Sequence, residues 1–99
     1  MASVEPIRAV DLASGPFESV TGAHRRTLEA IFHHPTAHNL EWEHVVGLIG
    51  SIGTSHEKSN NEFIFEVAGK RYLMHKPHTK DLTSNEVSDL RHFLMQVRA

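Results

Sequence analysis

The 99-residue sequence contains no cysteine, no long apolar run and no excess of charge of one sign. The absence of cysteine excludes disulfide bonds, thiolate metal ligands and cysteine nucleophiles, so packing has to stabilise the fold. No apolar run approaches the roughly 18 residues that a membrane-spanning helix needs. The formal net charge of −2 provides no global basic field, and any nucleic-acid binding therefore has to be local.

Length and composition predict one domain in the cytoplasm. A chain of 99 residues leaves no room for a second independent core, and its hydrophobic fraction of 39% is ordinary for a folded protein. Glu5 and Asp11 lie where a signal peptide would need a basic start and an apolar stretch. We therefore expect a cytoplasmic protein that does not associate with membranes.

The N-terminal part of the chain differs in pattern from the rest. The first 22 residues contain proline, glycine and serine, and their apolar residues follow no sustained period. We predict a flexible tail over residues 1–22 and a single α+β domain over residues 23–99. A short first helix opens the domain and ends before Pro35. Its apolar positions have helical spacing and are Leu28, Ile31 and Phe32.

A second helix is predicted between Asn39, as its N-cap, and Gly53, where we expect the left-handed conformation that ends many helices. Its apolar stripe consists of Trp42, Val45, Ile49 and Ile52. Three strands follow in the prediction, with tight turns between them. They span residues 54–58, 62–67 and 71–75.

A last amphipathic helix is predicted behind a capping box formed by Thr83 and Glu86. The element order is therefore α-α-β-β-β-α, and the fold class is α+β. The strands form a three-stranded antiparallel β-meander, and the helices pack on one of its faces to bury their apolar stripes. The other face is left open to solvent or to a partner.

Three segments between Leu40 and the C-terminus carry a family resemblance. They are the helix end Ile52-Gly53, the hairpin through Phe63-Ile64-Phe65, and the run His75-Lys76-Pro77-His78 that leads through Lys80-Asp81-Leu82 into the last helix. In these segments the chain resembles the HicA toxin family, small proteins with a double-stranded-RNA-binding-domain-like α-β-β-β-α fold. The resemblance implies RNA binding, a messenger-RNA-cleaving activity of the toxin–antitoxin type, and an antitoxin-like protein partner.

The sequence departs from the family at the catalytic position. The family has a Gly-Ser-His stretch at the start of the second strand, and this chain has Asn60-Asn61-Glu62 there. Metal-free RNA cleavage needs groups that accept and return protons near neutral pH. The candidate catalytic residues are therefore Glu62 and His56, which lies on the neighbouring strand. The histidines form no cluster typical of a metal site, so no metal or cofactor is expected.

The strongest functional feature is a run of positive side chains without an acidic residue. The predicted RNA-binding residues are Lys70, Arg71, His75, Lys76, His78 and Lys80. Such a run favours phosphate contacts that depend on shape and charge. An ordinary solvated loop has the same composition, and four Lys and Arg side chains give only a weak, salt-sensitive contact. A homodimer would double the patch.

Two functions remain open from the sequence. The first is a HicA-like RNA-binding protein, with or without nuclease activity. The second is a non-catalytic protein-interaction domain that uses the open sheet face or the N-terminal tail. Charge reversal in the basic run distinguishes them, because it abolishes only RNA binding.

Overall fold

The computed structural model describes residues 15–33 and 39–98. The elements in chain order are the short 3-10 helix η2 (Gly15–Phe17), α1 (Gly22–Phe32), α2 (Trp42–Ile52), β1 (Thr54–Ser59), β2 (Glu62–Val67), β3 (Lys70–His75) and α3 (Ser84–Arg98). The predicted α+β class and the order α-α-β-β-β-α are confirmed. None of the described helices is long and apolar enough to span a bilayer.

The three strands form one antiparallel sheet in the order β1-β2-β3. Both connections are tight turns whose two central residues have positive φ. These residues are Asn60 and Asn61 in the first turn, and Ala68 and Gly69 in the second. Two positive φ values in succession are the signature of a type I′ turn, whose twist matches that of the strands. Both turns lie where the sequence predicts them.

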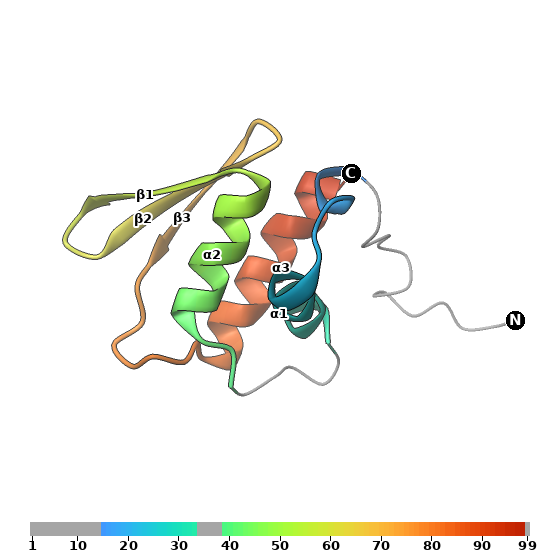
Figure 1. Ribbon diagram of the computed structural model, residues 1–99. Helices are drawn as coiled ribbons and strands as arrows, with labels where there is room; N and C mark the ends of the chain where they lie inside the picture. The colour runs from blue at the N-terminus through green and yellow to red at the C-terminus, as the bar shows by residue number, and fades with distance from the viewer. Residues whose placement is uncertain (1–14, 34–38, 99) are drawn as a thin grey trace, which may run out of the picture.

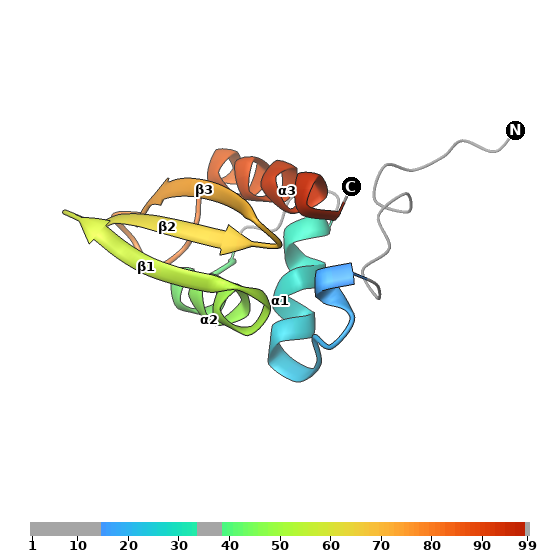
Figure 2. The same ribbon diagram turned by 90° about the horizontal axis from the view of Figure 1, so that it is seen from above.

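Helices α2 and α3 cover one face of the sheet, and α1 packs against these two helices rather than against the strands (Figures 1 and 2). Phe65 at the centre of β2 is fully buried and stacks on Trp42 of α2, with ring centroids 5.8 Å apart. The opposite face of the sheet carries no helix. The apolar side chains on this open face include Leu73, whose exposed fraction is 48%.

The described part of the predicted tail packs on the domain. Phe17 is fully buried, and its ring meets that of Phe32 edge-on with centroids 6.4 Å apart. Arg25 of α1 holds this segment, since its guanidinium donates to the carbonyl oxygens of Phe17 and Val20, each at 3.2 Å. The packed unit therefore begins by residue 15, earlier than the predicted boundary at residue 23. Residues 1–14 of the predicted tail lie outside the described residues.

The start of α2 differs from the prediction. Asn39 is not the N-cap, because the helix begins at Trp42 and Glu41 occupies the cap position without a side-chain cap bond. A backbone bridge explains the shift: the Trp42 N–H donates to the Lys80 carbonyl, and the Leu82 N–H donates to the Leu40 carbonyl, both at 2.8 Å. A contact between distant parts of the chain thus sets the first residue of α2.

The end of α2 is at the predicted residue but for another reason. Gly53 has φ −170°, which is extended rather than left-handed. A Cβ atom at this position would overlap the carbonyl oxygen of Glu66 on β2. Glycine is required here because the chain leaving α2 passes directly against the central strand.

The last helix begins as predicted. The Thr83 N–H donates to Glu86 Oε1 at 2.8 Å, and the Glu86 N–H donates to Thr83 Oγ1 at 3.2 Å. These reciprocal bonds form the expected capping box.

Candidate nucleic-acid interface

A group of exposed positive side chains lies on the loop between β3 and α3. We call residues 76–80 the cationic loop, and its charged or titratable side chains Lys76, His78 and Lys80 are all exposed. The Lys76 N–H donates to the Asn61 carbonyl oxygen at 2.8 Å and so holds the start of the loop against the β1–β2 turn. The backbone bridge at Lys80 anchors its other end to the start of α2.

Lys58 joins this end of the molecule, although the predicted site did not include it. It is an exposed residue of β1, next to a register shift between Glu57 and Ser59. In an antiparallel meander the last residues of the first strand and of the third strand lie at the same end of the sheet. That rule is the signal that would have placed Lys58 near the cationic loop.

The predicted residues Lys70 and Arg71 lie at the opposite end of β3. A strand of this length spans about 17 Å, at about 3.4 Å per residue, so the six predicted RNA-binding residues do not form one cluster. Arg71 is also paired, since its Nε lies 2.9 Å from Glu66 Oε2. The structure thus brings together His75, Lys76, His78 and Lys80, and separates the other two from them.

Carboxylates lie near the positive side chains at the end of the sheet that carries the cationic loop. Glu62 Oε2 lies 3.1 Å from His75 Nε2, and Glu57 Oε2 accepts the Asn61 N–H at 3.2 Å. Asp81 directly follows the cationic loop. Among the residues that the structure describes, no salt bridge holds Lys58, Lys76 or Lys80, so the positive charge at this end of the domain is concentrated on these three lysines.

The candidate catalytic residues His56 and Glu62 share the open face of the sheet. His56 lies opposite Ile64, and Glu62 lies opposite His75, so the two candidates are diagonal neighbours in adjacent rows. Such neighbours are about 7–8 Å apart in a regular sheet. The imidazole that contacts Glu62 is that of His75. Across residues 15–33 and 39–98, no group of three or more His, Asp or Glu side chains is arranged to hold a metal ion.

Tyr72, the single tyrosine, faces the helices. Its ring stacks on Phe93 of α3, with centroids 5.1 Å apart and an interplanar angle of 18°. Burial raises the pKa of the Tyr72 hydroxyl, and the negative charges of Asp89 and Glu86 raise it further. The ring is engaged within the domain and belongs to its packing.

This pKa predicts a measurable alkaline effect. The folded state holds the phenolic proton more tightly than the unfolded state, so the stabilisation is complete below the unfolded pKa of about 10 and declines as the pH rises through the folded value. Ultraviolet absorbance should show that the tyrosine of the native protein ionises above pH 10. In the urea-unfolded protein it should ionise near the ordinary tyrosine pKa of about 10. Equal titration midpoints in the two states would contradict the packing of Tyr72. Tyr72→Phe should remove this part of the alkaline destabilisation.

Comparisons with known proteins add no assignment. No protein-family model, curated protein or solved structure matches this chain. The function therefore has to be argued from the fold and the surface alone.

Proposed function

We propose that this protein binds RNA through the end of the domain formed by the cationic loop and the β1–β2 turn. One observation carries the proposal: Lys76, His78 and Lys80 are exposed on a loop whose two ends are fixed by backbone hydrogen bonds. A fixed loop presents its charges in one arrangement and loses less conformational entropy on binding than a free one.

The order of elements supports the choice of RNA. From α2 onward the chain follows the α-β-β-β-α order that double-stranded-RNA-binding-like folds share, and its sequence resembles the HicA family in the same region. Proteins of this kind bind RNA through phosphate and 2′-hydroxyl contacts more than through base sequence. With three lysines, including Lys58, we expect a weak contact that salt suppresses strongly.

Charge reversal tests the proposal. The double variant Lys76→Glu/Lys80→Glu should lower the affinity for a short RNA duplex at low salt by at least tenfold, because it replaces two phosphate contacts with repulsion. Lys70→Glu is the control for position: it reverses one exposed lysine at the far end of β3 and should lower the affinity by much less than half as much, on a logarithmic scale, as the double variant. NMR titration of the labelled protein should show the largest amide shifts at residues 58–62 and 75–80.

The same titration tests cleavage. A HicA-like nuclease activity would appear as shortened RNA, and loss of that activity in His56→Ala or Glu62→Ala would assign the catalytic groups. Intact RNA with amide shifts in the cationic loop would leave binding without catalysis. Absence of shifts at a large RNA excess would overturn the RNA proposal.

A protein-interaction domain is the second candidate function, and the open sheet face favours it. Leu73 and Ile64 lie opposite each other at the centre of this face, and Leu73 is the one large apolar side chain classed as exposed in the described residues. The salt bridge Arg71–Glu66 and the contact between His75 and Glu62 flank them. An apolar centre with a polar rim is typical of a protein interface. A partner bound there would tolerate the Lys76→Glu/Lys80→Glu change.

A further inference from the structure

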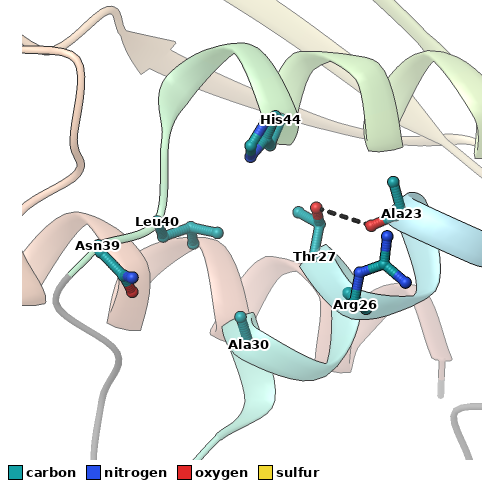
Figure 3. Close-up of a pocket in the computed structure, with 7 residues that line it drawn as sticks. All are labelled: Ala23, Arg26, Thr27, Ala30, Asn39, Leu40 and His44. Atoms are coloured by element: carbon teal, nitrogen blue, oxygen red, sulfur yellow. Dashed lines mark hydrogen bonds between the residues drawn. The ribbon is translucent and has the colours of Figure 1, made fainter.

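A hollow between α1 and the start of α2 has a lining suited to an anion. It measures about 180 Å³ and is lined by Ala23, Arg26, Thr27, Ala30, Asn39, Leu40 and His44 (Figure 3). The lining contains no acidic residue. Arg26 and His44 are both exposed, and in Figure 3 they lie on opposite helices across the hollow.

The donors available in the hollow are few and can be identified. The Thr27 hydroxyl donates to the Ala23 carbonyl oxygen at 3.1 Å, so its proton is already used. Within the described residues, no ion pair holds Arg26 or His44. The Arg26 guanidinium is the strongest remaining donor, and its planar fork matches two oxygens of one phosphate group.

The adjacent arginine has a different role. Arg25 is partly buried and bonded to the carbonyl oxygens of Phe17 and Val20, so it fastens the N-terminal segment. Arg26, one residue later, is directed to the hollow instead. Of these two arginines, Arg26 is the one presented to a ligand.

The hollow adjoins the cationic loop through the backbone bridge. The carbonyl oxygen of Leu40, which lines the hollow, accepts the Leu82 N–H, and the N–H of Trp42, the first residue of α2, donates to the Lys80 carbonyl oxygen. In Figure 1 the segment after β3 and the segment entering α2 run side by side at the bottom of the domain. Glu41 and Asp81 pair through their backbones in the bridge between these two segments. The hollow and the cationic loop therefore adjoin the same bridge, and the phosphates of one RNA can contact both.

We propose that this hollow binds a phosphate group of the same RNA that contacts the cationic loop, with the Arg26 guanidinium as its main donor. The inference rests on the proposed function and extends it to α1, which precedes the α-β-β-β-α unit. The RNA footprint then includes the α1–α2 junction as well as the cationic end of the sheet.

The test compares Arg26→Gln with Lys70→Gln in the full chain, using fluorescence anisotropy of a labelled RNA duplex over a series of salt concentrations. Arg26→Gln should weaken binding at low salt about tenfold, which corresponds to about 1.4 kcal/mol. The slope of log affinity against log salt should become shallower by about 1, as expected for the loss of one phosphate contact. Lys70→Gln should leave both quantities near those of the unmodified protein.

Three results would overturn the inference. If Arg26→Gln keeps the RNA affinity and salt slope of the unmodified protein while Lys76→Glu/Lys80→Glu binds weakly, the hollow does not contact RNA and the proposed function stands. Absence of RNA binding by the unmodified protein would overturn both the inference on the hollow and the proposed function. Inorganic phosphate that shifts the amides of residues 23–30, together with an unchanged RNA affinity in Arg26→Gln, would assign the hollow to free phosphate instead.

Discussion

Gly53→Ala is expected to destabilise the domain by about 3–5 kcal/mol, enough to leave much of the protein unfolded at room temperature. The added methyl group would overlap the Glu66 carbonyl oxygen and lie 3.0 Å from Val67 Cγ2. The backbone of the central strand cannot move aside without breaking the pairing of Thr54 with Glu66. The side chain is therefore excluded by its neighbours and not by the φ of the glycine.

A second glycine provides the control. Gly50 lies inside α2, three residues before Gly53, is exposed, and has open space where a Cβ atom would be. Gly50→Ala should stabilise the domain by about 0.5 kcal/mol through helix propensity. Urea denaturation followed by circular dichroism measures both variants. Equal midpoints for the two would show that α2 does not approach β2 as closely as described.

Phe65→Ala, as a single substitution, is expected to lower the free energy of unfolding by about 3–5 kcal/mol. Phe65 is fully buried in the central strand and stacked on Trp42, so its removal leaves a cavity between the sheet and α2. The fluorescence of Trp42, the single tryptophan, should change with the loss of this contact.

Leu73→Ala is the control for Phe65→Ala, because it truncates an apolar side chain of the same sheet that is not buried. Leu73 lies on the neighbouring strand but on the open face of the sheet, and its exposed fraction is 48%. Its truncation should change stability by only about 0.5 kcal/mol. Chemical denaturation that gives similar losses for Phe65→Ala and Leu73→Ala would contradict the assignment of the inner and outer faces.

The features that the sequence predicted correctly depend on neighbouring residues. The capping box needs only Thr83 and Glu86, and the turns need only the pairs Asn60-Asn61 and Ala68-Gly69 between the strands. The start of α2 was predicted wrongly because a backbone bridge to residues 80–82 sets it. Phe17 was assigned to the tail because a helix as short as η2 leaves no periodic pattern, although its ring is part of the core.

The candidate site shows the same limit. Lys70 and Arg71 were grouped with the cationic loop because they are close in sequence, but an extended strand carries them to the other end of the sheet. The pairs Arg71–Glu66 and His75–Glu62 follow directly from the register of β2 and β3. Applying that register to the sequence would have predicted both pairs.

Arg91 of α3 has a consequence for how the chain folds during synthesis. Its guanidinium donates to the carbonyl oxygens of Ile31 at 2.8 Å and His33 at 3.3 Å, and so completes the hydrogen bonding at the end of α1. These contacts join residues about 60 positions apart, and such long-range contacts slow folding. On the ribosome, α1 therefore emerges long before the helix that completes its hydrogen bonding, and the native core can close only after α3 has been released.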